Sequence, residues 1–278
     1  MELQAYLDRI NYRGAVEPTL ECLTGVHRQH ALTVPYENID VQLGYALDQD
    51  ISRIYDKIIT RRRGGWCYEL NGLLQWALQE IGFDVTRVVA GIHRHDRGDA
   101  VLGNHLVLLV RLDGTFIADL GLGDGIREPI PLHPGTHRQG ALEFNLENRD
   151  DGYWRFHNHS FGYPAKFDFR EIPADEMQLE AKCRFLQVSE DSVFVQNLAC
   201  QIMDLENVTC LTGRVLRHKR ADGTEKTLLN SPAELEATLH QVFGIDGVEI
   251  APLWSRVAAR HEVLFGDKPI GQIEVKGF

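Results

Sequence analysis

The chain has 278 residues, of which 44% are hydrophobic and 25% are charged, and its formal net charge is −11. This composition is typical of a globular protein with one large domain or two to three smaller ones. The acidic balance argues against a nucleic-acid binder, because phosphate recognition needs a basic surface. No apolar run approaches the roughly 20 residues of a membrane span, and the opening MELQAYLDRI predicts a helix rather than a secretory signal.

The five cysteines are odd in number, lie far apart and include no C-x-x-C pair: Cys22, Cys67, Cys183, Cys200 and Cys210. This pattern gives little support to a disulfide framework or a zinc site. It fits the reducing cytoplasm, where thiols stay free. We therefore expect a cytoplasmic protein with no metal, no membrane contact and no nucleic-acid partner.

Hydrophobic spacing predicts that the first 80 or so residues are helical. Four segments place apolar residues on one side of a helix: 3–10, 18–30, 51–59 and 68–81. Pro18 is expected in the first turn of the second helix, because proline suits that position. Gly82 is expected to end the fourth helix.

Beyond residue 84 the pattern changes to that of β-strands. Strands are expected over 85–92 and 105–112, and Asp113-Gly114 is expected to turn the chain back through 115–120. A second hairpin is expected to turn at Asp151-Gly152, and residues 161–169 alternate as a strand would. This section is predicted to be an antiparallel barrel or sandwich.

Beyond about residue 190 the pattern is mixed. Strands are expected over 208–218 and 226–229, around Asp222-Gly223. The run Ser231-Pro-Ala-Glu234 has the spacing of a capping box with proline at the first helical position, which predicts a helix to about Phe243. The order of helices, strands and a mixed section predicts an α+β multidomain fold.

Cys67 stands out in the stretch RGGWCYELNGLL, residues 63–74. Gly64 and Gly65 permit a tight turn that side chains would block. Cys67 then lies at a helix N-terminus, where unpaired N–H groups and the helix dipole lower a thiol pKa and favour a nucleophilic thiolate. The same N–H groups suit a developing oxyanion. The alternative is that Cys67 only fills the core, since free cysteine is among the most buried residue types.

A thiol nucleophile needs a base, and the base needs an orienting group. His105 opens an apolar strand, and Asp119 lies among apolar residues of the next strand of the same hairpin. A carboxylate there is costly unless it is paired. A Cys67–His105–Asp119 arrangement is therefore expected, with the alternative that His105 and Asp119 only satisfy each other in a polar part of the core.

These stretches resemble the arylamine N-acetyltransferase family, in its bacterial type. The resemblance runs in order along nearly the whole chain: AYLDRINYRG, VPYENID at 34–40, RGGWCYELN, GNHLVLLV at 103–110, FIADLGLGD at 116–124 and SEDSVF at 189–194. It implies the catalytic triad Cys67, His105 and Asp119. It also implies three domains: a helical bundle (1–83) with the nucleophile, an antiparallel β-barrel (84–190) with the base and its partner, and a C-terminal α/β lid (191–278).

The resemblance further implies a function. Acetyl-CoA would acetylate Cys67, and an aromatic amine would then take the acetyl group in a ping-pong order; hydrazines and N-hydroxyarylamines are further expected acceptors. Arg63 and Glu37 match an ion pair beside the nucleophile, and Trp66 matches an aromatic position. Gly121, Gly123 and Asp124 match a coenzyme-binding loop, whose backbone N–H groups would face phosphate. The alternative for this loop is a plain strand-exit turn, and a monomer or homodimer is expected.

Other functions remain possible interpretations of the same residues. The order Cys, His, polar residue also occurs in transglutaminase-like and papain-like cysteine hydrolases, and an amide synthase could share this architecture. A catalytically silent binding module is a further alternative. The H-x-H pairs at 93–95 and 157–159 are interpreted as solvated loop histidines rather than metal ligands. The run 61–63 is interpreted as cations at a helix C-terminus.

Overall fold

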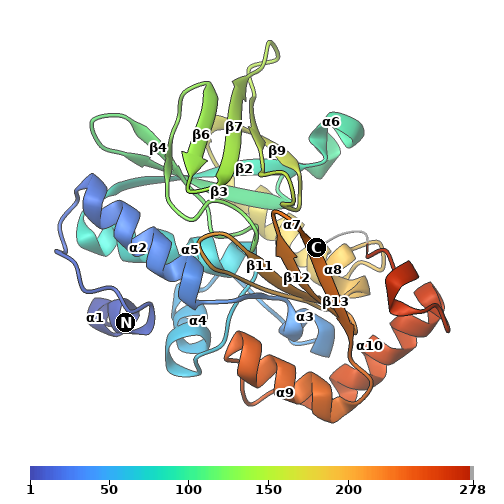
Figure 1. Ribbon diagram of the computed structural model, residues 1–278. Coiled ribbons are helices and arrows are strands. Elements are labelled where there is room, and N and C mark those ends of the chain that lie inside the picture. Colours follow the sequence, from blue (N-terminus) through green and yellow to red (C-terminus); the bar gives the residue numbers. More distant parts are fainter. Residues whose placement is uncertain (276–278) are drawn as a thin grey trace.

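The computed structural model describes residues 1–275, and its N-terminal third is helical as predicted (Figure 1). The elements are α1 (Leu3–Arg9), α2 (Leu20–Thr33), β1 (Tyr36–Glu37), α3 (Ile39–Leu43), α4 (Ile51–Tyr55), a π-helical turn (Asp56–Thr60) and α5 (Cys67–Ile81). The prediction for Pro18 was wrong by two residues. Thr19 caps α2 by accepting a hydrogen bond from the Cys22 N–H, so Pro18 lies just outside the helix.

Helix α5 is the element that carries the candidate nucleophile. Its apolar face packs on α4 and on the strands β2 and β3 described below. At its start, the Trp66 N–H donates to the Glu69 carboxylate at 3.2 Å, which satisfies one of the unpaired donors of the first turn. At its end Gly82 has φ +106, a conformation that glycine adopts without strain, so the predicted stop is confirmed.

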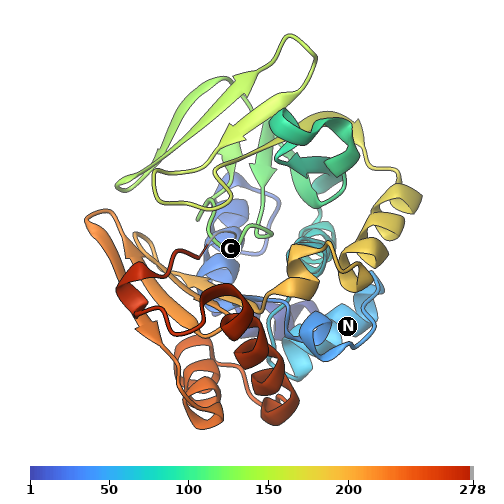
Figure 2. The same cartoon turned by 90° about the vertical axis from the view of Figure 1, so that its right-hand side faces the viewer.

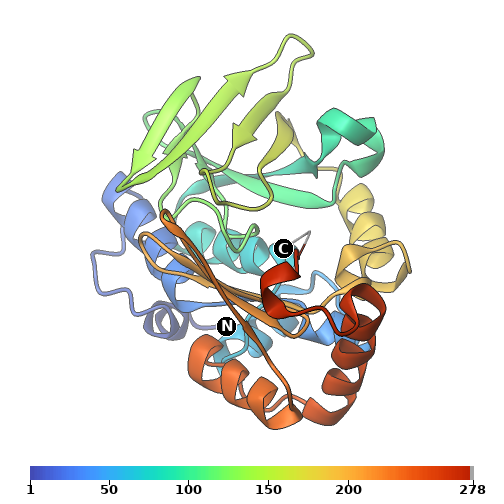
Figure 3. The same ribbon diagram turned by 45° about the vertical axis from the view of Figure 1, so that its right-hand side comes forward.

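Eight antiparallel strands form a curved sheet in the order β5-β4-β3-β2-β9-β8-β7-β6 (Figures 1 and 3). They are β2 (Asp84–Ile92), β3 (His105–Arg111), β4 (Thr115–Ala118), β5 (Ile130–Pro131), β6 (Gly135–Gln139), β7 (Leu142–Asn148), β8 (Trp154–His157) and β9 (Lys166–Pro173). The sheet curls into a nearly closed barrel around an apolar core that includes Phe144, Phe156 and Phe167. The predicted hairpin turns at 113–114 and 151–152 are confirmed.

The strand predicted over 161–169 begins later, at Lys166, and continues to Pro173. Residues 158–164 instead form a loop that bonds to the loop after β4. Between β2 and β3 lie α6 (Arg94–Arg97) and a 3-10 turn (Gly98–Val101), and after β9 come α7 (Glu176–Val188) and α8 (Val193–Gln196).

The last section forms a second sheet, in the order β1-β10-β11-β12-β13. Its strands are β10 (Ala199–Met203), β11 (Val208–Thr212), β12 (Val215–Arg220) and β13 (Gly223–Leu228), followed by α9 (Pro232–Phe243), α10 (Ile250–Phe265) and a 3-10 turn (Ile270–Gln272). The strand expected over 208–218 is two strands, because the chain turns at Gly213 with φ +56. The capped helix after Ser231 is confirmed.

These parts meet around the middle of the molecule. Figure 2 shows the barrel at one end, α9 and α10 at the other, and α7 along one side. The fold is the α+β arrangement of bundle, barrel and C-terminal α/β section that was predicted. Strand β1 pairs with β10, so the first and last sections share a sheet; the boundaries at residues 83 and 190 stay a prediction. No helix within residues 1–275 is both long and apolar enough to span a membrane.

Candidate active site

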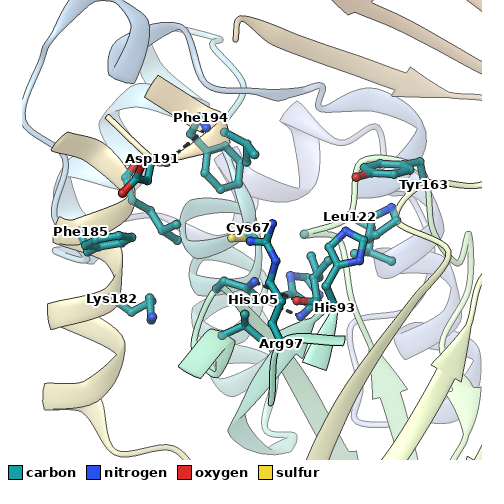
Figure 4. Close-up of a pocket in the computed structure, with 18 of the residues that line it drawn as sticks. Cys67, His93, Arg97, His105, Leu122, Tyr163, Lys182, Phe185, Asp191 and Phe194 are labelled. Carbon is teal, nitrogen blue, oxygen red and sulfur yellow. Dashed lines mark hydrogen bonds between the residues drawn. The ribbon is translucent and has the colours of Figure 1, made fainter. Parts of the chain in front are cut away.

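A cavity of about 390 Å³ opens where the bundle, the barrel and the last section meet (Figure 4). Cys67 and His105 both line it, from α5 and β3. The remaining wall is largely apolar and comes from separate segments: Leu122, Tyr163, Phe185 and Phe194. Such a mixture of apolar walls and a few polar groups is typical of a small-molecule site.

The Gly64-Gly65 turn positions Cys67 at this cavity. A Cβ on Gly64 would collide with the carbonyl oxygen of Pro35, and one on Gly65 would lie 2.8 Å from the Glu69 Cβ. Both positions therefore require glycine, as predicted. Cys67 is the first residue of α5, and its side chain lies at the bottom of the cavity with the residue only 2% exposed.

The backbone of Gly121 packs directly against Cys67. A Cβ there would lie 2.7 Å from the Cys67 Cβ and 2.9 Å from the Asn71 Nδ2. These distances are too short for any side chain. The first glycine of the Gly121–Gly125 loop is thus needed for close packing of backbone against the nucleophile.

His105 and Asp119 form a buried pair next to Cys67. The His105 Nε2 lies 2.8 Å from the Asp119 Oδ2. The other ring nitrogen, Nδ1, is buried and has no hydrogen-bond partner within residues 1–275. Because Asp119 accepts the Nε2–H, Nδ1 is left with a free lone pair. Figure 4 shows the His105 ring and the Cys67 thiol at the same cavity floor.

Asn71, which was not among the predicted site residues, holds Asp119 in place. Its Nδ2 donates to the Asp119 Oδ1 at 2.9 Å and to the Leu106 carbonyl at 2.9 Å, while its Oδ1 accepts from the Leu120 N–H at 2.8 Å. The signal was present in the sequence: Asn71 lies four residues after Cys67, so both side chains share one face of α5.

A second positioning contact comes from α2. The Asp119 N–H donates to the His27 Nε2 at 3.1 Å, and the His27 Nδ1 lies 3.0 Å from the Arg127 carbonyl. Burial lowers the pKa of His27, which keeps its ring neutral and able to accept. Hydrogen bonds therefore hold both the backbone and the side chain of Asp119.

Asp119 is ionised despite its burial. Burial alone would raise the pKa of this carboxyl, but the neighbouring His105 and the hydrogen bonds from His105, Asn71 and the Gly121 N–H outweigh it. The pKa of Asp119 consequently lies below its usual value. An ionised Asp119 keeps the proton on Nε2 of His105.

The thiol of Cys67 does not have the lowered pKa expected at a helix N-terminus. Burial raises its pKa well above the usual value, and the negative charge of Asp119 adds to this. The Tyr68 N–H favours the thiolate but does not outweigh burial. Burial therefore disfavours an isolated thiolate here, and an adjacent base would assist the loss of the thiol proton.

A buried ionic cluster supports the turn before Cys67. Arg63 lies 2.8 Å from Glu37 and 3.1 Å from Asp40, so the expected Arg63–Glu37 pair is present. Lys57 lies 2.8 Å from Asp40 and 2.9 Å from Glu69. Arg63 is thus buried and paired with carboxylates.

Asp124 is occupied by internal contacts. Its carboxylate bonds to the His159 Nε2 at 2.8 Å, to the Tyr163 N–H at 3.1 Å and to the Lys219 ammonium. The interpretation of His159 as a solvated loop residue was wrong, because it is buried and paired with Asp124. These bonds join the loop after β4, the loop before β9 and strand β12.

The remaining histidines of the two H-x-H pairs lie in different surroundings. His93 lines the cavity, and His157 lies 3.0 Å from Glu147. Within residues 1–275 no group of three or more histidine, cysteine, aspartate or glutamate side chains could hold a metal ion.

The chain is similar in sequence to proteins of a known enzyme family. The sequence model of an N-acetyltransferase family matches residues 19–250. The arylamine N-acetyltransferase of Mycobacterium tuberculosis is 34% identical over 259 residues, which cover 90% of this chain and 91% of that protein. The chain belongs to the arylamine N-acetyltransferase family. The human arylamine N-acetyltransferase 1 is 31% identical, covering 88% of this chain and 94% of its own length.

Solved structures of arylamine N-acetyltransferases share the fold. The Mycobacterium tuberculosis enzyme has a TM-score of 0.84 and 32% identity, covering 92% of this chain and 99% of that one. The Mycobacterium marinum enzyme in complex with CoA has a TM-score of 0.82 and 31% identity, covering 92% and 98%. Arylamine N-acetyltransferases are acyltransferases, so this chain is an enzyme of that class.

Proposed function

We propose that this chain transfers the acetyl group of acetyl-CoA to aromatic amines through an acetyl-Cys67 intermediate. The observation that carries the proposal is the buried, unpaired Nδ1 of His105 in the same cavity as the Cys67 thiol, among the described residues 1–275. Family membership supplies the donor and the acceptor class. His105 acts as the base, and Asp119 orients it and stabilises its charged form.

In the first half-reaction the Cys67 sulfur attacks the thioester carbon while its proton moves to His105 Nδ1. Burial raises the pKa of the Cys67 thiol, which favours moving its proton to His105 as the sulfur attacks. N–H groups at the start of α5 stabilise the oxyanion. The carbon–sulfur bond to coenzyme A then breaks, and its sulfur takes the proton from His105.

In the second half-reaction the amine attacks the acetyl-Cys67 carbon and gives a proton to His105. The Cys67 sulfur leaves and recovers that proton, so the free enzyme is restored. Donor and acceptor use the same nucleophile in turn, which gives a ping-pong order. Hydrazines and the hydroxyl of N-hydroxyarylamines are proposed acceptors for the same acetyl-enzyme.

The loop 121–124 is proposed to contribute to coenzyme binding through its backbone. Gly121 lines the cavity, whereas the Asp124 carboxylate already has three partners. Gly123 has φ +69, and a Cβ there would collide with Gln201, so its role is to let the loop pass close to β10. A cytoplasmic location is proposed because all five cysteines are free thiols.

The test is intact-protein mass spectrometry after mixing with acetyl-CoA and no amine. We expect a gain of one acetyl group that a small arylamine then removes, and no gain in Cys67→Ser. Cys183→Ser serves as the matched control, because Cys183 is a buried thiol that does not line the cavity. No acetylation of the wild type would refute the proposal and favour a cysteine hydrolase or an amide synthase.

A further inference from the structure

A second, much smaller cavity lies between helix α2 and strand β10. Its volume is about 10 Å³. Most of its lining is apolar and includes Val34, Leu70, Leu120 and Met203. Two hydrogen-bonding side chains reach it from opposite elements, His30 from α2 and Gln201 from β10. Gln201 also lines the active cavity, so the small cavity lies directly behind the active-site wall.

Each of these two side chains has one buried polar atom without a partner. Within residues 1–275, His30 Nε2 and Gln201 Oε1 make no hydrogen bond. His30 is 1% exposed and Gln201 is 2% exposed, so bulk solvent does not reach either atom. Buried polar atoms of this kind are rare in native proteins, because each has given up its bonds to water on folding. Two of them at one cavity point to a small molecule bound between them.

The neighbours of His30 make its Nε2 a donor. Burial lowers the pKa of His30 well below its usual value, so the ring is neutral and carries one N–H. Its Nδ1 lies 3.0 Å from the Tyr6 hydroxyl, whose proton has no other acceptor in the part of the chain that the structure describes. Burial also raises the pKa of Tyr6, so this hydroxyl keeps its proton. The Tyr6 O–H therefore donates to Nδ1, and the ring proton lies on Nε2.

Gln201 provides the acceptor. A Cβ on Gly123 would lie 2.2 Å from the Gln201 Oε1, so the loop after β4 packs directly on this oxygen. The backbone of Gln201 is held by the pairing of β10 with Tyr36 of β1. The cavity thus has a donor on the His30 ring and an acceptor on the Gln201 carboxamide, and the two atoms do not bond to each other directly.

We propose that one water molecule occupies this cavity and bridges His30 Nε2 to Gln201 Oε1. The water accepts the Nε2–H and donates one of its own hydrogens to Oε1, so both buried atoms gain a partner. The cavity volume of about 10 Å³ is close to the roughly 10–15 Å³ that one water needs, and a hydrated ion or an organic molecule would not fit. The bridge joins the helical section to the last section and does not depend on the proposed acetyl transfer.

The test is NMR spectroscopy of the full-length protein with ¹⁵N-labelled histidine. Proton–nitrogen correlation spectra give the tautomer of each ring, and cross-relaxation with the water signal shows which ring protons lie beside a bound water. We expect His30 to carry its proton on Nε2, and this proton to show a water peak of the sign that marks dipolar contact rather than proton exchange. Loss of the signals in His30→Phe assigns them.

His27 is the matched control within the same molecule. It lies in the same helix and is fully buried. Both of its ring nitrogens already have protein partners, the Arg127 carbonyl at 3.0 Å and the Asp119 N–H at 3.1 Å. We therefore expect the opposite tautomer for His27, with the proton on Nδ1, and no water contact at the ring.

Gln201→Met removes the acceptor oxygen at nearly constant size. We expect the water peak at His30 to disappear in this variant, while the signals of His27 stay as in the wild type and show that the fold is kept. Thermal unfolding is a separate check. The fall in Tm of the double variant His30→Phe, Gln201→Met should be smaller than the sum of the two single falls, because either change alone removes the bridge.

Four results would overturn the proposal. The first is a wild-type His30 with its proton on Nδ1. The second is an Nε2–H of His30 without a water peak, and the third is a water peak that persists in Gln201→Met. The fourth is strictly additive falls in Tm, since these would show that His30 and Gln201 do not share a bound molecule.

Discussion

Replacing Asp119 by asparagine should disable the base without changing its shape. The Asp119 Oδ1 accepts two hydrogen bonds, from Asn71 and from the Gly121 N–H. In Asp119→Asn the oxygen of the new side-chain amide must take that place, so its NH₂ group faces His105 Nε2. That nitrogen must then accept, and the ring proton moves to Nδ1. An Nδ1–H cannot take the proton of the Cys67 thiol.

The size of the effect follows from the role of the base. General base catalysis contributes about 10²–10⁴-fold, which corresponds to about 2.7–5.4 kcal/mol in the activation free energy. We expect acylation of Asp119→Asn by 4-nitrophenyl acetate to slow by that factor, measured by stopped-flow release of nitrophenolate. Thermal unfolding checks that the variant is folded. Acylation within about threefold of the wild type would refute the tautomer argument.

Three further predictions concern protonation and buried charge. In His105→Gln the pKa of the Cys67 thiol stays raised by burial, and the thiol has no base beside it. Its alkylation by iodoacetamide at pH 7 should therefore be far slower than in the wild type and should recover only in alkali. Equal alkylation rates at pH 7 would contradict the pairing of Cys67 with His105. The pKa of the Asp119 carboxyl is lowered in the folded chain. The stability that this carboxylate contributes is therefore complete above its ordinary pKa of 3.8 and is lost as the pH falls below that value. Urea unfolding of Asp119→Asn should show a weaker loss of stability over this acid range than the wild type. Lys57→Met leaves three buried carboxylates with Arg63 alone, so the free energy of unfolding should fall by about 3–5 kcal/mol, and a change below 1 kcal/mol in urea melts would argue against a tightly paired cluster.

The parts of the site that local pattern could predict are those that one segment defines. The glycine pair, the cysteine and the apolar face of the following helix lie within 20 residues, so spacing alone predicted α5 and the position of Cys67. The hairpin at 113–114 brings His105 and Asp119 onto adjacent strands. The two residues are close enough in the chain that the turn signal alone predicted that they are neighbours.

The remaining features depend on partners far apart in the chain. His159 was predicted to be solvated because its partner, Asp124, lies 35 residues earlier in another loop. Strand β1 has only two residues and exists because β10 pairs with it. The pKa of Cys67 was expected to be lowered, since a helix N-terminus is visible in the sequence and full burial beside Asp119 is not.

The split origin of the candidate triad links chemistry to assembly. Cys67 belongs to the helical section, whereas His105 and Asp119 belong to the barrel. Asn71 and Gly121 are among the contacts that join the two sections. Small shifts between α5 and the edge of the barrel would change the sulfur-to-nitrogen distance before either part lost its own fold. Enzyme activity therefore reports how well the helical section packs against the barrel. Heat, denaturant or a poorly packed substitution between α5 and the barrel should abolish activity while the helices and strands are still folded.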